Sequence, residues 1–111
     1  MKIEGEAKLL RIFVGESDKI HNIPVYEKIV LLAREKDLAG ATVLKGIMGY
    51  GKNSAIHTSK ILVLSEDMPL VVEIVDESER IEKFLEEIDK LFEESGASGL
   101  ITIEKAQVIK Y

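Results

Sequence analysis

One stretch of this chain constrains the fold more than any other: a short apolar strand followed at once by an amphipathic helix. Residues 70–75 (LVVEIV) are rich in β-branched side chains, which is typical of a strand. The apolar residues that follow recur about every 3.6 positions and predict one buried helix face: Ile81, Phe84, Leu85, Ile88, Leu91 and Phe92. Asp76 and Glu79 indicate a helix start by a capping box, and Gly96 indicates its end.

The rest of the chain predicts a second helix and three further strands. Residues 7–14 (AKLLRIFV) form a strand that is partly apolar on both sides. After a polar loop, the spacing predicts a helix that Asn22 caps, that runs to about Leu38 and that Gly40 ends. Residues 41–50 read as a strand running into a glycine-rich loop, and residues 51–60 as a polar loop. The segments 100–104 and 107–110 predict a last strand, and residues 105–106 leave open whether it is continuous or broken there.

The resulting order is β-α-β-β-α-β, and we read residues 1–111 as one domain. Two helices and one antiparallel sheet predict a ferredoxin-like α+β sandwich with both helices on one face. Nothing in the chain covers the other face, although both faces of the strands are partly apolar. The residues of the two faces are Leu10, Ile12 and Val14 against Leu9 and Phe13 in one strand, and Leu70, Val72 and Ile74 against Val71 and Val75 in the other. An uncovered apolar face is an association surface, so we expect a homo-oligomer.

Arg11 and Glu73 interrupt these apolar strands, and the topology predicts that their strands are neighbours. Two interpretations stay open. The two residues form an ion pair at a subunit interface, or one of them contacts a ligand.

Composition excludes several classes of protein. With 46% hydrophobic and 32% charged residues, the 111-residue chain is neither disordered nor a membrane protein. The net charge of −5 disfavours nucleic acids and anionic membranes as partners. The absence of cysteine excludes disulfides and thiolate chemistry, and the lack of a signal-peptide pattern predicts a cytoplasmic protein. One glutamine, two asparagines and abundant Lys and Glu indicate a heat-adapted source.

The segment 46–52 (GIMGYGK) is the main candidate site. Its three glycines allow close approach of the backbone, and amides beside Lys52 suit phosphate oxygens. It follows the P-loop pattern except that Asn53 replaces the Ser or Thr that would bind Mg²⁺. The plain alternative is a glycine-rich turn without a ligand. His21 and His57 lack the partners of a metal site, so we expect no metal.

Taken together in order, several motifs resemble those of the nitrogen-regulatory PII signalling proteins, and most closely an uncharacterised PII-like family. The segments that carry the resemblance span the chain: 15–18 (GESD), 41–46 (ATVLKG), 57–58 (HT), 69–75 (PLVVEIV), 99–102 (GLIT) and 108–110 (VIK). No single motif is specific, but their ordered combination is.

The resemblance implies a non-enzymatic regulatory homotrimer that binds an adenine nucleotide in clefts between subunits. The positions that match the family's nucleotide site are Gly46, Gly49, Tyr50, Gly51, Lys52, Glu73, Gly96, Gly99 and Lys110. It also implies no catalytic residue, no metal and no required cofactor beyond the bound ADP, AMP or ATP. Residues 51–60 correspond to the family's long T-loop, through which an unidentified target protein would bind.

Two departures from the family pattern bear on the ligand. The loop 95–100 (SGASGL) has the glycines but lacks the family's phosphate-binding lysine, which favours ADP or AMP over ATP. The segment after His57 has no tyrosine to uridylylate, so nitrogen control is not implied. Two alternatives stay open: a small enzyme that hydrolyses nucleotides at the glycine-rich loop, and a metal-tolerance or purely structural trimer of similar fold.

Overall fold

The structure is a computed structural model, and it describes residues 6–50, 57–58 and 68–111. Its elements follow the predicted order, with two short hairpin strands and two short ribbon strands added. In chain order they are β1 (Ala7–Gly15), β2 (Lys19–Ile20), β3 (Ile23–Pro24), α1 (Val25–Glu35), β4 (Thr42–Lys45), β5 (Met48–Gly49), β6 (His57–Thr58), β7 (Pro69–Glu77), α2 (Ser78–Ser95) and β8 (Leu100–Ala106).

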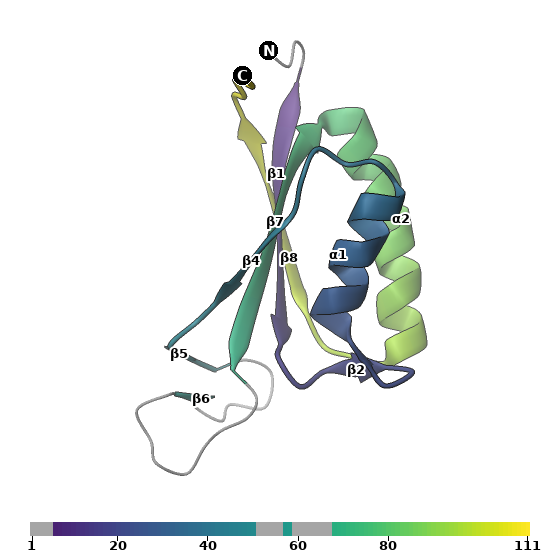
Figure 1. The fold of residues 1–111 in the computed structure, drawn as a ribbon, viewed down its shortest axis with the longest axis vertical. Helices are drawn as coiled ribbons and strands as arrows, with labels where there is room; N and C mark the ends of the chain where they lie inside the picture. Colours follow the sequence, from purple (N-terminus) through teal and green to yellow (C-terminus); the bar gives the residue numbers. More distant parts are fainter. Residues whose placement is uncertain (1–5, 51–56, 59–67) are drawn as a thin grey trace.

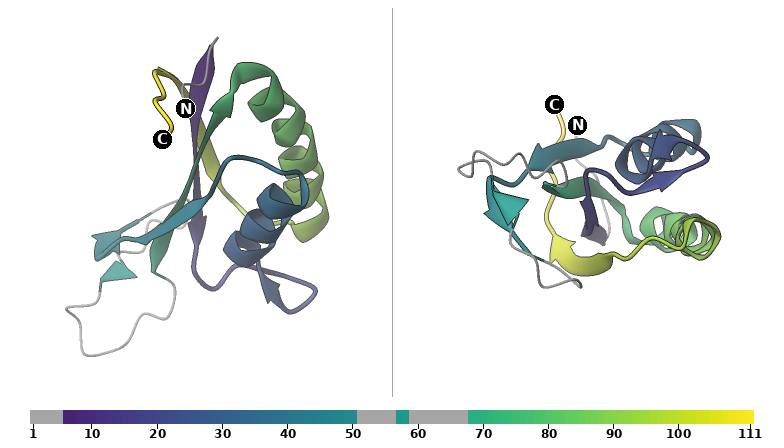
Figure 2. Two further views of the ribbon diagram at one scale, coloured as in Figure 1. Left: turned by 45° about the horizontal axis from the view of Figure 1, so that its top comes forward. Right: turned by 90° about the horizontal axis from the view of Figure 1, so that it is seen from below.

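Four of these strands form one antiparallel sheet in the order β4-β7-β1-β8. Both helices pack on the same face of this sheet, and the opposite face is open (Figure 1; Figure 2, right). The predicted ferredoxin-like α+β sandwich with its β-α-β-β-α-β order is therefore confirmed. We call the two sides of the sheet the covered face and the open face.

The core lies between the covered face and the two helices. Every second residue of β1 and β7 points into it, and these side chains are at most 5% exposed: Leu10, Ile12, Val14, Leu70, Val72 and Ile74. Helix α2 contributes the apolar set that its period predicts, of which Ile81, Phe84, Ile88 and Leu91 are buried, while Leu85 and Phe92 are partly buried. The prediction of these segments is confirmed, because the strong periodicity of their apolar residues indicates which side is buried.

The start and the end of α1 differ from the prediction. Asn22 does not cap the helix, because His21 and Asn22 both have left-handed backbones and form the turn of the β2–β3 hairpin. Pro24 stands before the first helical residue, and no side chain caps this end. The helix stops at Glu35, and left-handed Asp37 ends it, so Gly40 is not its stop signal.

Asp76 is not the cap of α2, because β7 continues through Glu77 before the helix begins. The Asp76 side chain is buried on the covered side of the sheet. Its carboxylate accepts hydrogen bonds from the amides of Ala39 (2.9 Å) and Glu77 (2.7 Å), and it lies 3.4 Å from Nε of Arg80. It thus ties the segment after α1 to the start of α2.

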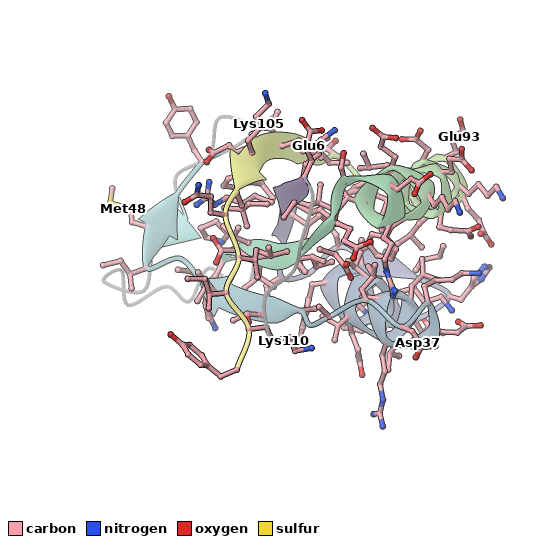
Figure 3. The ribbon with its side chains drawn as sticks, turned by 90° about the horizontal axis from the view of Figure 1, so that it is seen from above. Glu6, Asp37, Met48, Glu93, Lys105 and Lys110 are labelled. Atoms are coloured by element: carbon pink, nitrogen blue, oxygen red, sulfur yellow. The ribbon has the colours of Figure 1, made fainter. Side chains whose placement is uncertain are left out.

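The prediction for the C-terminal part of the chain is correct in outline but extends the last strand too far. Gly96 has a left-handed backbone and ends α2 as predicted. The last strand is continuous through 105–106, which settles the question of a break there. It ends at Ala106, so the prediction of a strand over 107–110 is wrong, and only Ile109 forms an isolated bridge. The segment after β8 crosses the end of the open face, towards the side of β4 (Figure 3).

The glycine-rich segment after β4 contains a short strand, β5, which pairs with β6 and forms a two-stranded ribbon beyond the end of the sheet (Figure 1). We call Met48–Gly49 and His57–Thr58 the β5–β6 ribbon. The polar loop predicted for residues 51–60 therefore includes a strand at 57–58. The remainder of that loop lies outside the described residues.

Candidate functional site

The base of the β5–β6 ribbon is packed closely against Pro69. A Cβ at Gly46 would lie 2.8 Å from Cγ of Pro69, and one at Gly49 would lie 3.0 Å from the same atom. The amide of Gly46 donates a 2.7 Å hydrogen bond to the Pro69 carbonyl. Close packing thus explains both glycines without a ligand, and the Gly46 amide is already used by the fold.

Three parts of the chain meet at this base: the loop after β1, the end of β4 and the start of β7. The amide of Glu16 donates to the Met68 carbonyl at 2.8 Å, which joins the first loop to β7. The Glu16 carboxylate accepts from Nζ of Lys45 at 2.8 Å, which joins the same loop to β4. Lys45 remains more than half exposed, so an anion at the ribbon base can reach its ammonium group.

The second pair of candidate glycines also has structural reasons to be glycine. Gly96 has a φ of +68°, a backbone angle that residues other than glycine rarely adopt. A Cβ at Gly99 would lie 2.6 Å from the Phe92 ring and 3.1 Å from the Phe13 carbonyl. The loop between α2 and β8 is therefore shaped by packing on Phe92.

The remaining candidates are spread over the molecule. Tyr50 is 72% exposed beside the ribbon, and Glu73 lies in the middle of the open face. Lys110 is exposed and directly precedes the C-terminus, which Figure 1 marks at the end of the sheet away from the ribbon. Gly51 and Lys52 lie outside the described residues. One chain therefore does not bring the candidate residues together, and a site that uses all of them needs more than one copy.

Arg11 and Glu73 are cross-strand partners, as the predicted topology requires, and they form an ion pair. Nε of Arg11 donates to Glu73 at 2.9 Å, and Nη1 donates to Glu104 on β8 at 3.0 Å. The hydrogen bond with Glu73 raises the pKa of the guanidinium above its ordinary value, and the carboxylate of Glu104 raises it further. Arg11 is thus held as a cation between two carboxylates.

Sequence reasoning missed two of these residues. Glu104 lies on β8 opposite Leu9 and diagonal to Arg11, and counting the antiparallel register of the last strand from Phe13–Leu100 would have found it. Lys45 was noted only as part of a motif, and its pairing with Glu16 depends on a loop contact between distant segments. No local pattern signals such a contact.

The described residues show neither a metal site nor a membrane-crossing helix. Within that part of the chain, no three His, Asp or Glu side chains gather in a group that could hold a metal ion. Neither of its helices combines the length and the apolar character that crossing a bilayer requires.

Comparison with known proteins identifies the family. The pattern of DUF190, described as "Uncharacterized ACR, COG1993", matches residues 7–108. The chain belongs to this family. It is 44% identical over 102 residues to a UPF0166 protein of Aquifex aeolicus, covering 92% of both chains. It is 36% identical over 105 residues to the UPF0166 protein MJ1524 of Methanocaldococcus jannaschii, covering 95% of this chain and 94% of the relative.

Solved structures share the fold at lower identity. CPII, a nitrogen regulatory PII-like protein from Thiomonas intermedia K12 bound to ADP, AMP and bicarbonate, has a TM-score of 0.69. It is 19% identical, and the match covers 94% of this chain and 89% of CPII. The fold that the resemblance to PII-like proteins implied is thereby confirmed, and the family model places the chain in an uncharacterised family.

The same fold also serves other functions. CutA1 of Ehrlichia chaffeensis, a divalent ion tolerance protein, has a TM-score of 0.61 at 12% identity, over 97% of this chain and 88% of CutA1. A phage SAM lyase has a TM-score of 0.58 at 13% identity, over 100% and 90% of the two chains. Fold alone therefore does not decide among the three functions considered above.

Proposed function

We propose that this protein is a non-enzymatic regulator that binds an adenine nucleotide, ADP or AMP in preference to ATP, between the subunits of a homotrimer. The observation that carries the proposal is the likeness to CPII, which was solved with ADP and AMP bound and whose fold matches 94% of this chain. Two predictions from composition, a cytoplasmic location and a heat-adapted source, stay predictions.

The distribution of the candidate residues supports a site between subunits. Gly46, Gly49 and Tyr50 lie in β5 of the ribbon or within two residues of it, whereas Lys110 directly precedes the C-terminus, which Figure 1 marks at the far end of the sheet. The resemblance assigns all four to one nucleotide site, and this requires that the ribbon of one copy approach the C-terminal end of another. Lys45 at the ribbon base adds a cation that the resemblance did not indicate.

Gly51 and Lys52 belong to the same proposal on sequence grounds alone. They follow Tyr50 directly, and Lys52 is the one lysine of the segment 46–52. Gly96 and Gly99 have packing reasons to be glycine, so in this proposal their loop contributes backbone groups to the ligand and no charge.

The test is calorimetric titration of the protein with ADP, AMP, ATP and adenosine. We expect ADP and AMP to bind more tightly than ATP, with one nucleotide per chain at saturation. The Lys110→Ala variant should weaken ADP binding, and Lys105→Ala, which changes another exposed lysine, this one on β8, should not. No heat of binding with any of the four ligands contradicts the proposal.

The enzymatic alternative has one specific observation in its favour, the phage SAM lyase of the same fold. Incubation of the protein with ATP and Mg²⁺ separates the two functions. A regulator forms no product above the buffer control, whereas multiple turnovers contradict the proposed non-enzymatic role.

A further inference from the structure

The open face of the sheet is organised in rows that run across the strands. Directly opposite residues of an antiparallel sheet point to the same side, so the register defines each row. The row that follows the Gly15–Pro69 pair at the ribbon end is apolar throughout and consists of Leu44, Val71, Phe13 and Leu100. The next row is polar throughout and consists of Thr42, Glu73, Arg11 and Thr102. The third row is apolar at Val75 and Leu9 and ends at Glu104.

The polar row holds its charges in a fixed arrangement. Arg11 donates to Glu73 within the row and diagonally to Glu104 in the next one, at 2.9 and 3.0 Å. The side chains of Arg11 and Glu73 are each about one-third exposed (32% and 30%), so their neighbours already remove much of their water. A guanidinium has five N–H donors, and these contacts use two of them, which leaves donors for a partner.

We infer that this polar row sets the register in which copies of the chain pack their open faces together. The inference rests on the self-assembly that is part of the proposed function. A slide by one row is a displacement of about 7 Å, two residues along a strand. It would press Arg11 and Glu73 of one copy against the apolar rows of the other. Although these charges keep each other as partners, they would lose the water that still reaches them, and the free donors of Arg11 would face apolar side chains. The slid arrangement is therefore disfavoured.

A second copy is the partner that fits this face. The open face of a second copy presents the same sequence of apolar, polar and apolar rows. When the polar rows of the two copies meet, the apolar rows on either side of them meet as well. The row also carries both signs of charge, with the free donors of Arg11 available to carboxylates of another copy. A partner surface whose charges were all positive would offer Arg11 no carboxylate, and one whose charges were all negative would offer the two carboxylates no cation.

The polar row contributes to the choice of packing register and not to the stability of the association. The apolar rows supply the favourable burial on association, and desolvation of the charges opposes it. Replacement of a buried ion cluster by apolar side chains of similar size often leaves an interface as stable or more stable. The charges then act only by penalising the wrong registers, as a single buried polar residue does in some coiled coils.

Pulsed electron resonance between spin labels tests this inference directly. The chain has no cysteine, so the substitution Lys28→Cys on α1, remote from the open face, gives one label per copy. Wild-type assembly should give one narrow set of label distances. The triple variant R11M/E73M/E104Q should still assemble but give a broadened set or a second set, because its registers are no longer distinguished.

Two further variants make the test complete. Arg11→Met alone leaves two carboxylates on the face without a cation, so the dissociation constant of the assembly should rise roughly tenfold or more. Lys8→Met removes an ion pair of 3.3 Å with Glu82 on the helix side and should change nothing. Circular dichroism checks that each variant folds.

Three results overturn the inference. The triple variant gives the same narrow distances as the wild type, or R11M assembles as tightly as K8M, or the wild type shows no interaction between labels. The first two leave the proposed nucleotide-binding trimer intact. The third removes the trimer as well, whereas the nucleotide titration judges ligand binding separately.

Discussion

The two faces of the four-stranded sheet are built from alternate residues of the same strands, yet they differ in nearly every property. On the covered face, Ile12 and Val72 are completely buried under the helices. On the open face, Leu44 and Leu100 are 49% and 62% exposed, and an ion cluster interrupts the apolar surface. The covered face completes its packing within one chain. The open face has the composition of a surface that completes its packing with another molecule.

The first prediction contrasts neighbouring residues of β1 that point to opposite faces. Ile12→Ala should lower the free energy of unfolding by about 2–5 kcal/mol at every protein concentration, because it leaves a cavity in a core internal to the chain. Phe13→Ala on the open face should cost less in the dissociated chain and should mainly weaken assembly. Chemical denaturation at several protein concentrations measures both effects. Equal losses that do not depend on concentration contradict the distinction between the faces.

The second prediction concerns the one charged residue buried among the described residues of the covered side. Asp76→Asn places an NH₂ group or a weaker acceptor against the amides of Ala39 and Glu77, which now donate to a carboxylate. We expect a loss of about 1–3 kcal/mol in unfolding free energy and no change in assembly. The exposed neighbour Glu77→Gln is the control and should stay within about 0.5 kcal/mol of the wild type. A loss of assembly in Asp76→Asn at unchanged stability would contradict the assignment.

These contrasts also show what the sequence reveals. Strands β1 and β7 and helix α2 were predicted because their periodicity is a local property that the core enforces. The β2–β3 hairpin was missed because its strands have two residues each, too few to show alternation, and Asn22 is as good a turn residue as a cap. The role of Asp76 was misread because its partner Ala39 lies 37 positions away.

The candidate site was harder to predict than the fold. The glycines at 46 and 49 suggest a phosphate loop in sequence, but their contact with Pro69 is visible only in three dimensions. Arg11 and Glu73 were paired correctly because strand order alone determines their meeting. The spread of the other candidates over both ends of the sheet depends on the path of the whole chain.

The third prediction tests whether the ribbon base is shaped by packing. Gly46→Ala should cost about 1–3 kcal/mol, because the new Cβ lies 2.8 Å from Pro69. Gly40→Ala, with nothing within 4 Å, should be neutral or stabilising by about 0.4–1 kcal/mol. Neither glycine has a left-handed backbone, so the comparison tests the room that each position leaves for a Cβ. Thermal unfolding compares them, and partial rescue of Gly46→Ala by Pro69→Ala would identify the contact responsible.

The fourth prediction concerns ligand binding and has the smallest effect. Lys52→Ala should weaken ADP binding roughly tenfold, AMP binding less and adenosine binding least, because a lysine contacts phosphate and not the base. Unfolding should be unchanged. Calorimetry with the three ligands gives the order, and equal losses for all three would indicate a disturbed fold in place of a phosphate contact.

The central claim, that the open face is covered by further copies of the same chain, is tested most directly by the mass of the protein in solution. Light scattering at micromolar concentration, with and without ADP, distinguishes a 12.4-kDa chain from its assemblies. The account predicts a mass of three chains that persists on dilution through the micromolar range. A stable mass of 12.4 kDa under both conditions would contradict it.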